Sequence, residues 1–332
     1  MSLKNLTVGK RITAGFIIIL SLFVCVVGIA IINANKVSTT MVLSGNAGQL
    51  DKYIMTARGY EKEYIINKDD KSVKGLAKNV SDAAGLLEDL KGKTTDDALL
   101  SDISYGKTLI KSYHNGFKKL VENNGKSEAE TAKMEKASSG LLTALNDKIR
   151  KQIDIKQGMT FVTGETLNPI YLEVANLAGL MSMEFMEGRL SEGAFILHND
   201  ESYTRKVHSQ LQVCDKTRKE LATAVKISRD DEMAGAYGII EKELATYGKS
   251  FNNLVSLWKN NNQISGNMLS DGDKVIEIGN KVKQNAEGEM VAAKDSLIRL
   301  SVILLATGII AGIVLAFFIV RSIGKALNRI IA

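Results

Sequence analysis

The chain has 332 residues, of which 45% are hydrophobic and 24% charged, and its formal net charge is +6. It contains a single proline, where average usage of about 5% would give roughly seventeen, so long helices are favoured over β-sandwiches, barrels and other loop-rich folds. Two cysteines exclude a disulfide framework, and His114, His198 and His208 have no metal-ligand spacing, so we expect neither a metal nor a cofactor.

The positive charge is confined to the two ends of the chain. Six basic residues without acidic neighbours account for the whole net charge of +6: Lys4, Lys10, Arg11, Arg321, Lys325 and Arg329. The sequence between them is therefore neutral. A nucleic-acid partner would need a basic face in that part of the chain, so none is expected.

Two apolar runs lie beside the charged ends, at residues 12–34 and 299–320. Each holds the roughly 20 apolar residues that cross a bilayer as a helix. The first has no signal-peptidase cleavage pattern and reads as an uncleaved anchor. Basic residues outside both runs place residues 1–11 and 321–332 in the cytoplasm. We therefore expect a multi-pass protein of the inner membrane, with residues 35–298 in the periplasm.

The segment between the runs is polar, with apolar residues at helical spacing. Clusters of turn-forming and helix-capping residues divide it. Two of these clusters are at residues 123–127 and 260–263. The helices expected from this pattern are 36–67, 71–91, 96–122, 127–162, 168–198, 202–226, 229–260 and 264–298.

Part of this segment occurs twice. Residues 57–70 match 188–201, and residues 112–121 match 246–255 at nearly the same offset. The first pair carries an apolar heptad seam at the same positions in both copies. We predict two copies of a four-segment helical unit, at about 35–163 and 165–298, with their exact helix partition left open. The expected fold is all-α, with two transmembrane helices flanking a double four-helix bundle.

Two glutamates, Glu61 and Glu192, occupy seam positions where apolar residues are expected. A buried carboxylate without a partner is costly, and Arg58 and Arg189 lie three residues earlier, within reach along a helix. One interpretation is a structural ion pair in each copy. The other is that Arg58, Lys62 and Arg189 face the interior and bind the carboxylate of a ligand, which suits the fork of an arginine.

Three stretches resemble bacterial transmembrane chemoreceptors. LTVGKRITAGFI at residues 6–17 is similar to the start of many methyl-accepting chemotaxis proteins. RSIGKALNRII at residues 321–331 resembles the start of a HAMP linker, although Ala326 stands where that family usually has proline. The element at residues 58–66 resembles the signature of the helical bimodular (HBM) sensor domain, from which the second copy departs at Gly193 and Ala194.

The resemblance implies a homodimer whose periplasmic domain stacks two bundles and senses a small solute, with an organic acid the expected ligand. It also implies signalling through the second span and the HAMP linker to a cytoplasmic chemotaxis kinase and its adaptor. No nucleophile set, phosphate loop or dinucleotide motif occurs, so we do not expect this chain to be an enzyme. Two alternatives remain: a sensor histidine kinase or other two-component sensor with its output domain after Ala332, and a receptor that docks a periplasmic binding protein.

Overall fold

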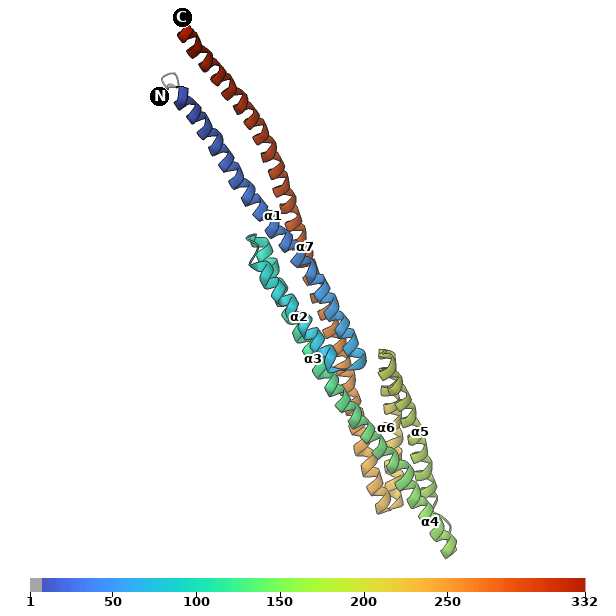
Figure 1. The fold of residues 1–332 in the computed structure, drawn as a ribbon. Coiled ribbons are helices and arrows are strands. Elements are labelled where there is room, and N and C mark those ends of the chain that lie inside the picture. The colour runs from blue at the N-terminus through green and yellow to red at the C-terminus, as the bar shows by residue number, and fades with distance from the viewer. Residues whose placement is uncertain (1–7, 332) are drawn as a thin grey trace. The chain divides into compact units, whose positions relative to one another are not determined.

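The computed structural model describes residues 8–331, which are helical apart from short connections and contain no strand (Figure 1). The expected all-α fold class is thus confirmed for these residues. Residues 1–7 of the expected cytoplasmic N-terminus, and Ala332 at the end of the expected HAMP segment, lie outside the described residues. The elements are α1 (Val8–Asn67), α2 (Asp70–Lys91), α3 (Asp97–Thr143), a π-helical segment η2 (Ala144–Ile149), α4 (Arg150–Thr163), α5 (Pro169–His198), α6 (Glu201–Ser228) and α7 (Asp231–Ile331).

Four aspartates fix the starts of α2, α3, α6 and α7. Each accepts a hydrogen bond from a backbone N–H two or three residues further on, at 2.7 to 3.1 Å. These N–H groups have no partner within the helix, so the caps define where each helix begins. The aspartates occupy equivalent places in the two copies: Asp69 and Asp96 in the first, Asp200 and Asp230 in the second.

Two of the expected breaks do not occur, because α3 continues through residues 123–127 and α7 through residues 260–263. The asparagines of the two segments bond to one another. Asn123 Nδ2 donates to Oδ1 of Asn260 (2.8 Å) and of Asn261 (2.9 Å), and Asn261 Nδ2 donates to Oδ1 of Asn124 (3.1 Å). Asparagine favours turns when its side chain bonds the local backbone. Here the side chains are engaged across two helices, so both backbones stay helical.

The chain forms two compact units. Unit 1 contains the residues up to Asn115 and those from Asn267 onward, and unit 2 contains Gly116–Gly266. The units therefore differ from the two sequence copies at 35–163 and 165–298. Because α3 and α7 do not turn back, the two copies exchange their last segments. Residues 127–162 of the first copy belong to unit 2, together with the first three segments of the second copy. Nearly all of residues 264–298 of the second copy belong to unit 1, together with most of the first three segments of the first copy. The arrangement as two stacked bundles stays a prediction.

The seam positions expected from the heptads are buried in both units. In unit 1 they are Ala47, Leu50, Ile54, Ala57, Glu61 and Tyr64, and in unit 2 Ala178, Met181, Phe185, Gly188, Glu192 and Phe195. Complete burial of one large apolar side chain stabilises a fold by about 1.5–3 kcal/mol. Within unit 1, α7 approaches α1 so closely at Gly279 that an added Cβ would lie 3.1 Å from the carbonyl oxygen of Ala47.

Two helices, α1 and α7, are long and apolar enough to cross a membrane. The most apolar 18-residue window of each contains no buried residue. Large side chains such as Phe23 in α1 and Leu305 in α7 are 67% and 70% exposed. Continuous apolar surface of this length is typical of helices that lipid covers. The expected spans at residues 12–34 and 299–320 lie within these two helices.

We predict that Asn123→Ala lowers the free energy of unfolding by about 1–2 kcal/mol, because it removes two hydrogen bonds that the buried side chain of Asn123 donates. Thermal melts of the detergent-solubilised chain measure the change. Asn262→Ala is the matched control: Asn262 is exposed, and alanine favours helix more than asparagine does, so its melting temperature should stay equal or rise. Equal loss in both variants would contradict the role of the cluster.

Candidate functional site

A buried carboxylate lies in the core of unit 1. Glu61 of α1 is 9% exposed, and it accepts a hydrogen bond of 2.8 Å from the hydroxyl of Tyr113 in α3, which is fully buried. Burial, followed by the charge of Glu61 and this hydrogen bond, raises the pKa of Tyr113. The tyrosine therefore remains protonated at neutral pH and acts as a donor to the carboxylate.

The same pair occurs in unit 2. Glu192 of α5 accepts a hydrogen bond from the buried hydroxyl of Tyr247 in α7, and burial, followed by the charge of Glu192, raises the pKa of this tyrosine too. Tyr113 and Tyr247 are the second residues of the matched segments 112–121 and 246–255. The repeat therefore carries a signal for the pair, because the tyrosine occurs at the same place in both matched segments.

The two arginines that precede these glutamates behave differently. In unit 2, Arg189 Nη1 donates to both carboxylate oxygens of Glu192, at 2.8 and 3.1 Å, so the expected ion pair is formed. In unit 1, Arg58 Nη2 instead donates to Asp273 Oδ1 and to the carbonyl oxygen of Leu269, both at 2.7 Å. Arg58 thus bonds groups on α7, whereas Arg189 bonds the glutamate on its own helix.

A glycine makes the alternative contact of Arg58 possible. An added Cβ at Gly272 would lie 2.7 Å from Nη2 of Arg58, so any larger residue would displace the guanidinium. Arg58 thereby ties α1 to α7 through one carboxylate and one backbone carbonyl. Sequence spacing could not reveal this contact, because Asp273 lies 215 residues away along the chain.

Lys62 does not join Arg58 in the interior, as one interpretation of the sequence expected. It lies on the exposed face of α1, whereas its neighbour Glu61 is buried. Of the three predicted ligand-binding residues, Arg58 is engaged with α7 and Lys62 faces outward. Arg189 borders a groove.

This groove lies in unit 2, along the end of α3 and the π-helical segment, and has a volume of about 370 Å³. Its size is near the lower end of ordinary small-molecule sites, and π-helical turns are frequent at functional sites. It also contains two carboxylates, Glu135 and Asp147, while the charge of Arg189 is already matched by Glu192. The lining residues are Glu135, Ser138, Ser139, Leu142, Thr143, Asn146, Asp147 and Arg189.

The charges of the groove decide which ligands it suits. A dicarboxylate would bring its second negative charge towards Glu135 or Asp147. A molecule with one carboxylate and one ammonium group would place the carboxylate on Arg189 and the ammonium near the two acids. The geometry therefore favours a zwitterion, such as an amino acid, over the organic acids expected from the sequence.

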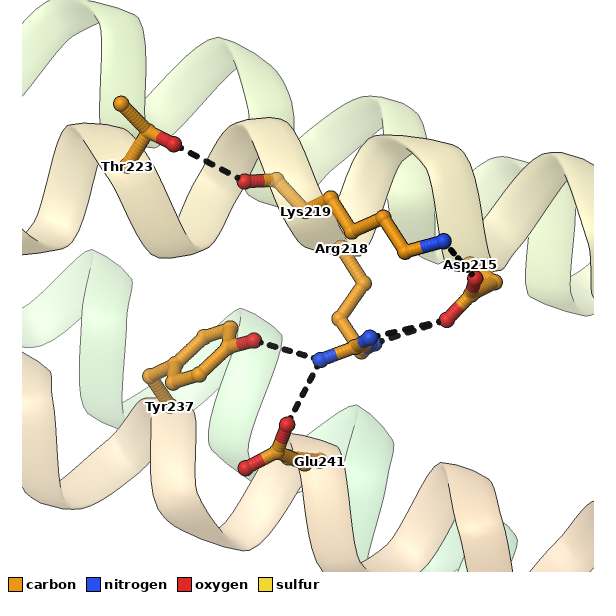
Figure 2. A network of polar contacts seen from close by, with 6 residues as sticks. All are labelled: Asp215, Arg218, Lys219, Thr223, Tyr237 and Glu241. Atoms are coloured by element: carbon orange, nitrogen blue, oxygen red, sulfur yellow. Dashed lines mark hydrogen bonds and ion pairs between the residues drawn. The ribbon is translucent and has the colours of Figure 1, made fainter.

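A second polar network lies between α6 and α7 (Figure 2). Arg218 donates to the hydroxyl of Tyr237 and to Glu241, both at 2.7 Å, and to Asp215 at 3.0 Å. Lys219 also pairs with Asp215 at 2.7 Å, and its hydrogen bond, followed by that of Arg218, lowers the pKa of Asp215. Two cations and two carboxylates balance one another, so the network is a tie between helices rather than a ligand site.

No model of a known protein family matches the chain, and no curated protein matches it either. In the part of the chain that the structure describes, no group of three or more histidine, cysteine, aspartate or glutamate side chains could hold a metal ion. The interpretation of the site thus rests on the geometry of the groove and on the two glutamate–tyrosine pairs.

We predict that Tyr113→Phe and Tyr247→Phe each destabilise the protein by about 1–3 kcal/mol, because each leaves a buried carboxylate with one hydrogen bond fewer. Chemical unfolding of the detergent-solubilised chain measures the loss. Tyr105→Phe is the control, since Tyr105 in α3 is 50% exposed and its stability should be unchanged. If the three variants lose stability equally, the hydrogen bonds to the glutamates are not what stabilises the core.

Proposed function

We propose that the chain is the sensory part of a bacterial transmembrane chemoreceptor, anchored in the inner membrane by two spans and carrying a periplasmic HBM-like double bundle. The observation that supports this most is the continuity of α1 and α7. These helices, of 60 and 101 residues, pass without a break from the packed helical body into the two exposed apolar segments. A change in packing in the body is thereby carried along rigid elements to both spans.

The contact of Arg58 with Asp273 supports the same proposal. It ties α1 to α7, the two helices that continue into the candidate spans, and so fixes their relative register. A ligand that favours another register moves the second span, the HAMP segment at residues 321–332, and through it the cytoplasmic kinase and adaptor. The shift in this equilibrium is limited by the difference between the affinities of the ligand for the two states.

The proposed ligand is a small molecule with a carboxylate and an ammonium group, bound in the groove beside Arg189. The guanidinium of Arg189 recognises the carboxylate, and Glu135 and Asp147 recognise the ammonium. Ser139 and Asn146 supply further polar groups along the same groove. This replaces the organic acid expected from the sequence and moves the site from Arg58 in unit 1 to Arg189 in unit 2.

A second candidate function is the docking of a solute-loaded periplasmic binding protein. Phe161 and Val162 at the end of α4 favour it, because they are 92% and 86% exposed. Exposed apolar side chains at a helix end are typical of protein contacts. In this case a free solute would not stabilise the receptor, but the solute-loaded binding protein would bind it tightly.

The proposed topology makes a direct prediction. Reporter fusions after residue 34 and near residue 298 should show activity characteristic of the periplasm, because both positions follow or precede a span on its outer side. A fusion after residue 321 should show cytoplasmic activity. A cytoplasmic signal from any position between 35 and 298 would contradict the receptor.

The ligand prediction uses thermal melts of the detergent-solubilised chain with alanine, serine, succinate and malate as probes. An amino acid should stabilise the protein by about 2.7 kcal/mol at a hundredfold excess over its Kd. The double variant Arg189→Ala with Glu192→Gln should lose this gain without stranding a buried charge. Asp147→Asn should weaken binding of the amino acid at least tenfold and improve binding of the dicarboxylates.

Arg205→Ala is the control for this experiment, because Arg205 is an exposed arginine of α6 in the same unit. Its ligand response should equal that of the parent chain. Stabilisation by dicarboxylates alone would contradict the assignment of the ammonium to Glu135 and Asp147. Full ligand response in the Arg189 double variant would place the site elsewhere.

A further inference from the structure

Helix α5 is apolar on two opposite faces. Its inner face holds the seam of unit 2, including Met181, Phe185 and Phe195, which is buried. A second seam runs along the outer face at the same heptad spacing. Its large residues are Leu172, Met183, Met186, Leu190 and Leu197, which lie 11, 3, 4 and 7 residues apart.

The outer seam is exposed, and no other helix of the unit covers it. Met183, Leu190 and Leu197 are 63%, 75% and 74% exposed. None of the seam positions between Leu172 and Leu197 holds a charged residue, whereas the outer face of α6 carries charges such as Lys216 and Glu220. A helix that is apolar on all sides is stable in water only when both faces are covered.

The repeat preserves this seam. The positions of Leu172, Met186 and Leu197 correspond to Met41, Met55 and Ile66 of α1, which are 131 residues earlier and are also exposed. In α1, however, lysines occupy the positions of Met183 and Gly193: Lys52 and Lys62. The first copy therefore retains a seam interrupted by charge, and the second copy has a continuous one.

We propose that the outer seam of α5 binds the same seam of a second copy of this chain, helix against helix, about a two-fold axis. An uncharged heptad seam is complementary to itself and brings no like charges together. All five large side chains of the outer seam are exposed, between 48% and 75%, so the seam offers an unbroken apolar surface for burial against a second copy.

Two glycines allow the helices to approach closely. Gly179 and Gly193 lie in the outer seam, and an added Cβ at either position would meet nothing within 4 Å. The space above them is therefore free for side chains of the partner, in the manner of knobs packing into holes. The inference deepens the proposed receptor and rests on it for one feature only: anchoring of both copies in one membrane makes the two α5 helices parallel.

Disulfide cross-linking in membranes tests this interface with the full chain. Leu190→Cys and Met183→Cys are made with Cys25→Ser, so that the introduced thiol is the reactive one. Burial, followed by the charge of Glu184, raises the pKa of Cys214 to about 12, and this buried thiol can stay in place. Lys242→Cys on α7 is the control, because the side chain of Lys242 is 77% exposed.

Under mild oxidation we expect both seam variants to form a covalent dimer at least ten times more than the Lys242→Cys control. Adding Leu190→Glu to Met183→Cys should abolish the cross-link while the melting temperature is kept, because the side chain of Leu190 is exposed in the single chain. No excess over the control, cross-linking only to a protein of another mass, or a cross-link that survives Leu190→Glu would each overturn the proposal. The groove beside Arg189 does not need the dimer, so the Leu190→Glu variant should keep the ligand-induced thermal shift. A kept shift without a seam cross-link would overturn the dimer interface and leave the proposed receptor standing.

Discussion

Four asparagines, two on α3 and two on α7, bond to one another at the places where the sequence predicts that both helices end. Asn123 and Asn124 would end a helix if their side chains bonded the local backbone, and so would Asn260 and Asn261. Bonded to one another, they leave both backbones helical. As a result, α3 and α7 run straight on, and each sequence copy contributes its fourth segment to the other unit. Each of these hydrogen bonds is modest in energy, and together they engage the side chains that would otherwise favour a turn in each backbone.

The two copies share the buried glutamate–tyrosine pair of the core, and they differ in the ion pairs between helices at the surface. Both keep a glutamate in the apolar seam and a buried tyrosine that donates to it, because a buried tyrosine hydroxyl without an acceptor costs stability. The ties between the second and third helices show the difference. In the first copy Glu88 pairs with Lys107, and in the second Arg218 pairs with Glu241, with the signs reversed. If the second helix of one copy packed against the third helix of the other copy, two charges of the same sign would therefore face each other.

Local interactions explain what the sequence could predict. The helix boundaries near residues 67, 91, 163 and 198 and the buried seam positions follow from caps and heptads, which involve residues at most four apart. The errors concern partners far away along the chain. Asn123 finds its partners 137 and 138 residues later, and Arg58 finds Asp273 215 residues later. The groove was missed for the same reason, since Asp147 and Arg189 belong to different helices and no spacing rule relates them.

Arg58 and Arg189 occupy equivalent places in the two sequence copies but bond to different partners. A guanidinium that already bonds a carboxylate and a backbone carbonyl must give up these bonds before the same N–H group can bind a ligand. Arg189 holds both carboxylate oxygens of the glutamate one turn away on its own helix through a single nitrogen, Nη1, so the other nitrogens of its guanidinium can bind a carboxylate from the groove. Recognition is therefore less costly in unit 2, and rigidity between α1 and α7 is greater in unit 1. Because α7 is one helix from Asp231 to Ile331, it contributes both to unit 2, which holds the proposed ligand groove, and to unit 1, where Arg58 ties it to α1.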